Sequence, residues 1–455
     1  MDEVKLPEGW EYSQLLKLGT IVTGKTPSTK DVDNFGGNVP FIKPGDLDKG
    51  GFITKTSDTL TESGLLTVPK LPVNAIVVTC IGNLGKVGIT TKISATNQQI
   101  NSFICNENLN FKFLYYQICT LKPWLENESS ATTIAIVNKG KFSKAPISIP
   151  SLAEQKIIAD KLDTLLAQVD STKAQLEKIP QILKRFRQAV LVAAVSGNLT
   201  EEWRAQNPDQ TCTKIVSLGD IIIDGPQNGI YKPSSLYGSG HKIVRIDSFY
   251  DGVLCDWNTF KRVQLESSDV KKWSLRNNDI LINRVNSIEY LGKCGLVENL
   301  PEVTVFESNI MRITLNPEKA VAKFVTIFLS SIIGLSRLRE NAKLAVNQAS
   351  INQKDVKSCK IELPSISEQT EIVHRVEQLF SYADTIEKQV QNALERVNNL
   401  THSILAKAFR GELTAQWRVE NPDLISGENS AQALLVQIQQ QRSSIKTIKR
   451  GKGNS

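Results

Sequence analysis

The sequence predicts a mixed α/β fold in which two globular blocks alternate with two long helices. Three observations lead to this prediction. One helical segment occurs twice, at an offset of 214 residues. Each copy keeps apolar residues at a 4-3 spacing over about four to five heptads. The stretch before each copy holds short β-branched runs that Gly, Pro, Asn and Asp interrupt.

The internal repeat is visible in two pairs of segments. IPSLAEQKIIADKLDTLLAQVD, from Ile149, matches LPSISEQTEIVHRVEQLFSYAD, from Leu363. SGNLTEEWRAQNPD, which ends at Asp209, matches RGELTAQWRVENPD, which ends at Asp423. All matches share one offset without a gap. The two segments are therefore copies of one helical element.

Each copy carries signals for the start and the end of a helix. Ser151–Glu154 and Ser365–Glu368 both read Ser-x-x-Glu, which predicts a capping box at the first turn. Gly197 and Gly411 follow the periodic runs and predict the stops. Pro180 interrupts the first copy, where we expect a kink or a break.

The apolar stripe of each copy needs a partner. A helix of about 43 residues would extend roughly 65 Å and cannot bury its stripe alone. The other copy is the obvious partner, and a plain dimerisation coiled coil is the alternative. The predicted seam residues are Ile158, Leu162, Leu165, Val169 and Leu176 in the first copy, and Ile372, Val376, Leu379, Ile386 and Val390 in the second.

The globular blocks resemble each other weakly. Leu84–Ile89 reads LGKVGI and Leu291–Leu296 reads LGKCGL. We expect mixed sheets in both blocks, with helix at 111–121 and 320–340, and a pseudo-two-fold molecule. The predicted boundaries are 1–149 for the first block, 150–209 for the first helical copy, 210–362 for the second block, 363–424 for the second copy, and 425–455 for a C-terminal helix with a basic tail that is unstructured from Lys446 to Lys452.

Composition excludes several classes of protein. The seven Cys are scattered without a C-x-x-C pair and there are only three His, so we expect neither disulfides nor a metal site. No run approaches the roughly 18 apolar residues of a membrane span, and the first residues lack a signal-peptide pattern. We therefore expect a cytoplasmic protein. The net charge of +7 permits nucleic acid binding without proving it.

Two motifs could suggest catalysis. Gly19–Thr26 fits the phosphate-binding pattern G-x-x-x-x-G-K-[ST], which would make the chain an ATP-dependent enzyme. That loop must open a helix, whereas Pro27 and polar residues follow here, so a strand and a polar loop are the better interpretation. Asn207–Asp209 lacks the second Pro and the aromatic residue of an adenine methyltransferase site. We expect no catalytic residues.

The arrangement resembles the specificity subunit of type I restriction–modification enzymes, in particular an enteric, type IA-like subfamily. The repeated segments quoted above carry the resemblance, which covers nearly the whole chain. It implies that each block is a target recognition domain that reads one half of a bipartite, asymmetric DNA site. It also implies that the two helical copies pack as an antiparallel coiled coil and set the spacer between the half-sites.

The resemblance further implies partners. Two modification subunits, which use S-adenosylmethionine to methylate adenine, would dock on the helices. Two ATP-driven, Mg-dependent restriction subunits would complete a nuclease. This chain would then hold no cofactor and bind double-stranded DNA, away from membranes. A coiled-coil scaffold for proteins and a duplicated RNA binder remain as alternatives.

DNA contacts must come from loops of the two blocks. Phosphates attract Lys and Arg, guanine attracts Arg, and adenine attracts Asn and Gln. The first block has no Arg, and the cluster Asn283–Asn286 is the strongest candidate in the second. The candidates are Lys25, Thr26, Lys43, Asn83, Lys86, Gln98, Gln99, Asn138 and Lys139 in the first block, and Asn228, Tyr231, Lys232, Arg245, Asn283, Arg284, Asn286, Lys293, Asn309, Asn347 and Gln348 in the second.

Overall fold

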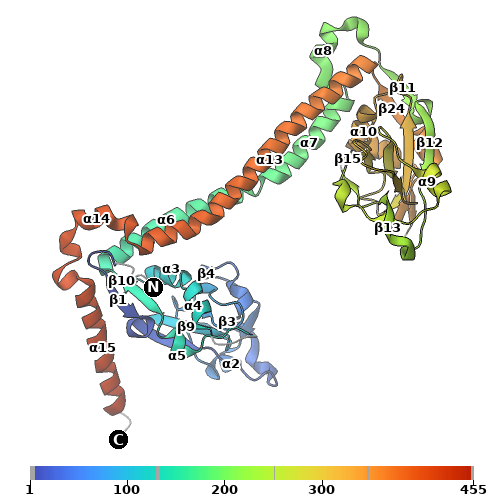
Figure 1. Cartoon of the computed structure of the whole chain (residues 1–455). Coiled ribbons are helices and arrows are strands. Elements are labelled where there is room, and N and C mark those ends of the chain that lie inside the picture. The colour runs from blue at the N-terminus through green and yellow to red at the C-terminus, as the bar shows by residue number, and fades with distance from the viewer. Residues whose placement is uncertain (1–5, 130–133, 251, 346–347, 452–455) are drawn as a thin grey trace. The chain divides into compact units, whose positions relative to one another are not determined.

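The computed structural model describes residues 6–129, 134–250, 252–345 and 348–451 (Figure 1). The chain divides into two compact units. Unit 1 combines Met1–Gln175 with Ala393–Ser455, and unit 2 is the continuous stretch Leu176–Asn392. Each unit therefore holds one globular block together with helix from both copies of the repeat.

The first copy of the repeat forms two helices. These are α6 (Leu152–Leu176) and α7 (Ile179–Val195), so the break expected near Pro180 is confirmed. Proline has no N–H to donate and its ring clashes with the carbonyl four residues back, but it is tolerated in a first turn, where Pro180 lies. Leu394 occupies the matching position in the second copy, and α13 (Ile366–Phe409) is continuous.

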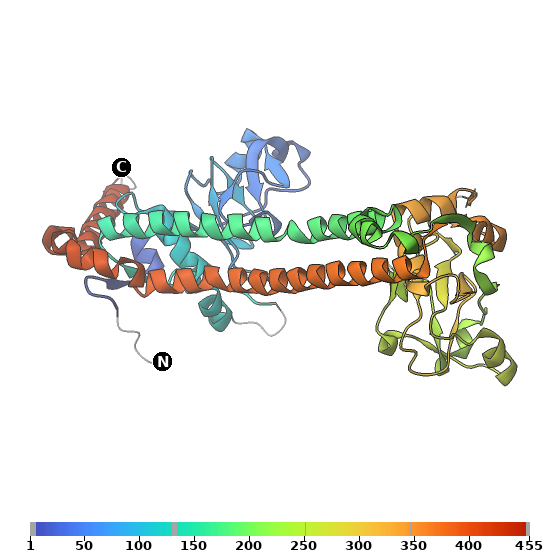
Figure 2. The same ribbon diagram turned by 90° about the horizontal axis from the view of Figure 1, so that it is seen from above.

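Helices from the two copies pack in both units. In unit 1, α6 and the last part of α13 run side by side in opposite directions (Figures 1 and 2). Ile158 and Leu162 are buried in one cluster with Ile404 and Ala408. In unit 2, Val190 of α7 shares a cluster with residues of the first part of α13. Of the predicted seam residues, Ile158, Leu162, Val169, Ile372, Val376 and Val390 are buried, whereas Leu165, Leu176, Leu379 and Ile386 are half-buried.

The first block is built on a five-stranded sheet. Its strand order is β2-β9-β6-β7-β4, and a three-stranded sheet, β5-β3-β8, accompanies it. α3 lies where a helix at 111–121 was predicted. The bounds are β2 Gly19–Thr23, β3 Phe35–Ile42, β4 Phe52–Ile53, β5 Asp58–Leu60, α2 Glu62–Leu66, β6 Ile76–Thr79, β7 Val87–Thr90, β8 Ala95–Thr96, β9 Ile100–Cys105, α3 Phe111–Cys119, α4 Lys122–Glu128 and α5 Lys139–Phe142.

The second block repeats this plan with additions. Its main sheet has the order β12-β21-β17-β19-β15-β14, beside the sheets β16-β13-β20 and β18-β23-β22. Helices α10 and α11 confirm the helix predicted at 320–340. The bounds are β12 Ile222–Asn228, β13 Tyr237–Val244, β14 Phe249–Tyr250, β15 Gly252–Leu254, β16 Arg262–Val263, α9 Ser267–Trp273, β17 Ile280–Asn283, β18 Val285–Asn286, β19 Cys294–Leu296, β20 Thr304–Phe306, β21 Ile310–Leu315, α10 Ala322–Ser330, α11 Ile332–Arg339, β22 Lys343–Ala345, β23 Gln348–Ser350 and α12 Gln353–Ser358.

Each block is anchored at the start of its long helix. The antiparallel pairs β1 (Glu11–Gln14) with β10 (Pro146–Ile149), and β11 (Lys214–Ser217) with β24 (Lys360–Leu363), lead into α6 and α13. The Gln155 side chain accepts a hydrogen bond from the backbone N–H of Asn110 (3.0 Å), and Gln369 accepts one from Val321 (2.7 Å). These amides hold the start of α6 against α3 and the start of α13 against α10.

The predicted capping boxes form only in part. The hydroxyl of Ser151 accepts from the backbone N–H of Glu154 at 3.3 Å, and Ser365 accepts from Glu368 at 3.2 Å. The reciprocal bond, which each Ser backbone N–H would donate to the Glu carboxylate, was wrongly predicted. Both carboxylates bind the end of the other repeat copy within their own unit, because a buried charge needs a cationic partner more than a single N–H.

These contacts form two equivalent buried clamps. In unit 1, Oε1 of Glu154 accepts from the Thr414 hydroxyl and from Nη1 of Arg418, each at 2.6 Å. Arg418 also donates to the carbonyl of Gly411 at 2.9 Å. In unit 2, Glu368 accepts from Thr200 at 2.7 Å and from Arg204 at 2.9 Å. The short helices α8 (Glu201–Gln206) and α14 (Ala415–Glu420) supply the two arginines.

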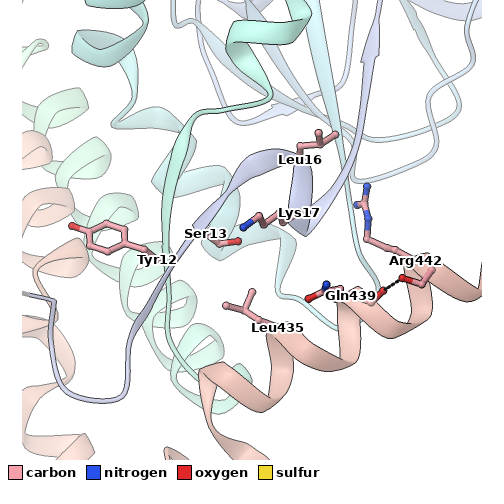
Figure 3. Close-up of a pocket in the computed structure, with 8 residues that line it drawn as sticks. Tyr12, Ser13, Leu16, Lys17, Leu435, Gln439 and Arg442 are labelled. Carbon is pink, nitrogen blue, oxygen red and sulfur yellow. Dashed lines mark hydrogen bonds between the residues drawn. The ribbon is translucent and has the colours of Figure 1, made fainter.

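A C-terminal helix, α15 (Ala431–Gly451), packs on the first block. Ala431 and Ile438 are buried, and the Asn106 side chain donates to Gln441 at 2.9 Å. The expectation that the segment from Lys446 is unstructured was wrong, because α15 continues to Gly451 and no Gly or Pro interrupts it before that residue. Lys452 lies outside the described residues. A pocket of about 470 Å³ separates α15 from the segment Tyr12–Lys17 (Figure 3).

Candidate nucleic-acid interface

Several candidate residues of the first block meet at one edge of its sheet. The loop after β2 lies against the turn before β9, where the backbone N–H of Lys25 donates to the carbonyl of Thr96 at 2.9 Å. The Thr26 hydroxyl donates to the side chain of Gln98 at 2.7 Å. The segment after β6 joins them, because the N–H of Cys80 donates to the carbonyl of Gln99 at 2.8 Å. Lys25, Thr26, Gln98 and Gln99 therefore lie together.

The second block assembles the same edge from the same loops. The N–H of Ile230 donates to the carbonyl of Phe306 at 2.9 Å, as Lys25 does to Thr96. The N–H of Arg284 donates to the carbonyl of Asn309 at 2.9 Å, as Cys80 does to Gln99. Tyr231 thus corresponds to Thr26, and Asn309 to Gln99. The blocks place unrelated side chains at equivalent positions of one scaffold.

The residue that follows the long strand of each smaller sheet belongs to this edge as well. Ile42 pairs with Thr96, and Val244 pairs with Phe306, in the same parallel register. Lys43 and Arg245 are therefore equivalent. Lys43 forms an ion pair with Asp58.

In the second block the edge encloses a pocket of about 430 Å³. Nε of Arg245 lies 3.6 Å from a carboxylate oxygen of Glu307, and Nζ of Lys232 lies 2.7 Å from Asp269. Tyr231 is 77% exposed, so its ring is available to a ligand. The pocket is lined by Ile230, Tyr231, Lys232, Ser234, Tyr237, Arg245, Lys261, Glu307, Ser308 and Asn309.

The lining of this pocket holds more cations than carboxylates. Lys232, Arg245 and Lys261 line it with one carboxylate, that of Glu307, whereas Asp269 and Asp247, outside the lining, pair with Lys232 and Arg245. Burial raises the pKa of Glu307, although the N–H of Ile246 (2.7 Å) and the Arg245 guanidinium act in the opposite direction. Three cations beside an aromatic ring and amide groups can bind a phosphodiester and a base edge.

Sequence reasoning missed several residues of this pocket. Those that line it without having been candidates are Ile230, Ser234, Tyr237, Lys261, Glu307 and Ser308. Burial is the first cause that raises the pKa of Tyr237, followed by the nearby Glu307 carboxylate. Lys261 and Glu307 come from segments far from Tyr231 in the sequence, and the pairing of β13 with β16 and β20 brings them to this pocket. No local sequence signal points to these two residues.

The cluster predicted as strongest is only partly accessible. Asn283 is fully buried in β17, and its two polar side-chain atoms have no hydrogen-bond partner among the described residues. This burial corrects the expectation that Asn283 contacts DNA, because both faces of β17 are covered and all of its residues are buried. Nη1 of Arg284 donates to the carbonyl of Ser308 at 3.3 Å, beside the pocket, and Asn286 is half-buried.

The remaining candidates are more scattered. Asn138 caps α5 by accepting from the N–H of Lys141 at 2.9 Å, and Lys86 forms an ion pair with Asp48. Nζ of Lys293 lies 4.4 Å from the ring centre of Tyr290. Asn83, Lys139, Asn228 and Gln348 are exposed, and Asn347 lies outside the described residues.

The segment that fits the phosphate-binding loop has a different structure. Gly19–Thr23 is the strand β2 itself, and no helix begins directly after Thr26. In a phosphate-binding loop, backbone N–H groups cradle the phosphates at a helix N-terminus. That geometry is missing here. In the described part of the chain no group of three or more His, Cys, Asp or Glu could hold a metal ion, and no helix there is long and apolar enough to span a membrane.

Comparison with known proteins defines the class. The model of the type I restriction modification DNA specificity domain matches residues 7–181 and again 213–396. The chain therefore belongs to the family of type I restriction–modification specificity proteins.

Individual relatives narrow the comparison. The chain is 40% identical to the type I restriction enzyme EcoKI specificity subunit of Escherichia coli K12, with 97% of both chains covered. It is also 40% identical to the StySPI specificity subunit of Salmonella potsdam, again over 97% of both. The HsdS subunit of Thermoanaerobacter tengcongensis shares the fold, with a TM-score of 0.55 at 16% identity over 90% of this chain and 99% of that one. A second solved chain, from work on complex assembly of the type I R-M system, gives 0.65 at the same identity and coverage.

Proposed function

We propose that this chain is the DNA-reading subunit of a type I restriction–modification complex. Residues 1–149 and 210–362 would each read one half of a bipartite, asymmetric site. The observation that carries the proposal is the equivalent edge of the two blocks, where the same loops present different polar side chains. Two readers of one design with different side chains are what an asymmetric split site requires. Neither an ATP-dependent enzyme nor a protein scaffold accounts for this edge.

The helical copies, 150–209 and 363–424, would set the spacer and bind the partner subunits. The amide contacts of Gln155 and Gln369 support this role because they fix each block to the start of its helix. The two buried clamps support it because they join the two repeat copies within each unit. A rigid attachment of each reader is a condition for a spacer of fixed length. Residues 425–455 would hold the first block through α15.

The partners and cofactors follow from the family. We propose that two modification subunits with S-adenosylmethionine and two restriction subunits with ATP and Mg²⁺ assemble on this chain in the cytoplasm. The chain itself would be non-catalytic and bind double-stranded DNA. Adenine methylation and cleavage would belong to the partners.

The test is to sequence modified adenines in DNA from cells with the complex. Exchange of residues 1–149 for those of a relative should change one half of the methylated motif, and a change in both halves would contradict the domain assignment. Within the second block, Arg245→Ala should weaken specific binding by about 1–3 kcal/mol and relax one position of the motif. The control is Arg337→Ala, which removes an exposed ion pair with Glu362 away from the pocket and should leave the motif unchanged.

A further inference from the structure

Unit 2 contains a second pocket, away from the edge described above. It has a volume of about 260 Å³ and lies between the second block and the two helices α7 and α13. Leu191 of α7, Val376 and Phe380 of α13, and Thr326 of α10 provide its walls. Val253 of β15 stands at its opening and is 68% exposed. The pocket is mostly apolar and reaches the surface.

Unit 1 shows what occupies the equivalent place. Phe52 pairs with Ile89, and Val253 pairs with Leu296, in equivalent parallel ladders, so Gly51 corresponds to Gly252. On the facing helix, Tyr115 of α3 corresponds to Thr326 of α10. The hydroxyl of Tyr115 accepts a hydrogen bond from the backbone N–H of Gly51 at 2.8 Å. The phenol ring therefore spans the space between helix and strand.

The second block has no such ring. A Cβ atom built on Gly252 would lie 3.0 Å from Oγ of Ser330 and 3.3 Å from Cγ2 of Thr326, so α10 presents only these two short side chains to Gly252. Threonine is shorter than tyrosine by most of a phenol ring. Ile327 replaces the second aromatic residue, Tyr116, whose ring contacts that of Tyr115 edge-on at 5.1 Å between ring centres. The pocket of unit 2 is thus the volume that an aromatic side chain fills in unit 1.

The rim of the pocket is acidic. Glu298, Glu377 and Asp384 line it together with one cation, Lys323. Nζ of Lys323 lies 2.5 Å from Glu377 and 3.3 Å from Glu298, so one lysine is shared by two carboxylates. Asp384 pairs with Arg187 at 2.7 Å. The carboxylates that line the pocket outnumber its single lining cation, which favours a positively charged neighbour.

We propose that this pocket receives an aromatic side chain, flanked by Lys or Arg, from a segment of a partner protein. Apolar walls that match one aromatic ring, with charges at the rim, are the usual form of an anchor site in a protein interface. This proposal rests on the proposed function in one respect, namely that the partner protein is a subunit of the same complex. Its binding chemistry is independent of DNA reading.

The direct test uses short peptides as probes on the full-length chain. Acetyl-Lys-Tyr-Arg-amide should bind at one site, and acetyl-Glu-Tyr-Glu-amide should bind at least fivefold more weakly. Ligand-observed NMR measures both affinities. Thr326→Tyr should abolish binding by filling the pocket from within, as Tyr115 does in unit 1. Tyr115→Thr is the matched control and should create a second site. Asp384→Asn, which leaves the apolar walls intact, should reduce only the preference for the basic peptide.

Several outcomes would overturn the proposal. Equal binding of both peptides would exclude a preference for a basic partner segment. A peptide that binds the Thr326→Tyr variant as tightly as the parent chain would show that the site lies elsewhere. If Thr326→Tyr does not fold, the Asp384→Asn and Tyr115→Thr results decide. In the assembled complex, Thr326→Tyr should weaken retention of the modification subunit at least fivefold and leave the methylated motif unchanged. A changed motif with normal assembly would instead indicate a defect in DNA reading.

Discussion

The buried clamp of unit 1 yields a quantitative prediction. Glu154 is 0% exposed and the Arg418 side chain is 13% exposed, so Glu154→Ala leaves a guanidinium with little access to water. Breaking a buried pair from one side costs about 3–5 kcal/mol. In unit 2 the Arg204 side chain is 32% exposed and can be solvated after Glu368→Ala, so we expect about half that cost.

Hydrogen exchange followed by mass spectrometry is the suitable assay, because a chain with two units need not unfold in one step. Glu154→Ala should lower the opening free energy of peptides around residues 151–160 and 411–420. Glu368→Ala is the matched control and should lower the opening free energy of peptides around residues 365–375 and 197–206. A loss below about 0.5 kcal/mol in Glu154→Ala, or an equal loss in both units from either variant, would refute the reasoning.

Three further predictions follow from single residues. Gly411→Ala should lower stability by about 1–2 kcal/mol in thermal denaturation, because its φ is +72° and the added Cβ would lie 2.5 Å from Cγ of Pro7; an unchanged Tm would contradict this. Iodoacetamide at pH 8 should label the exposed Cys212 well before Cys80, since burial raises the pKa of the Cys80 thiol to about 11; peptide mass spectrometry gives the order, and equal labelling of the two would contradict this. DNA affinity should rise as pH falls toward the raised pKa of Glu307, because protonation removes the one negative charge that lines the pocket. Glu307→Gln should flatten that profile in a binding titration, and a variant that keeps the parent's slope would exclude Glu307 as its source.

Local signals predicted the helices well. The repeat, the Ser-x-x-Glu starts and the stops at Gly197 and Gly411 predicted where helix begins and ends, and Pro180 predicted the break, because each acts within a turn or two of its own position. The side-chain partner of Glu154 was beyond such reasoning. Arg418 is 264 residues away, and a local capping bond was the only partner that the sequence offered.

The sequence also predicted only part of the candidate interface. Residue type alone selected Tyr231, Lys232, Arg245 and Asn309, which the fold brings into one pocket. It also selected Asn283, which is buried because both faces of β17 are covered, and the sequence does not show this covering. Burial and non-local pairing decide which polar residues reach the surface, and neither is encoded within a short window.

The division of the chain into a continuous unit and a composite one has a consequence for biosynthesis. All residues of unit 2 have been synthesised when the ribosome has passed Asn392, whereas unit 1 also requires the residues from Ala393 onward. Until Arg418 leaves the exit tunnel, the carboxylate of Glu154 lacks its cationic partner and the buried clamp of unit 1 cannot form. A chain that terminates prematurely would therefore have a folded unit 2 and an incompletely folded unit 1, and proteases would degrade it faster than the full-length product.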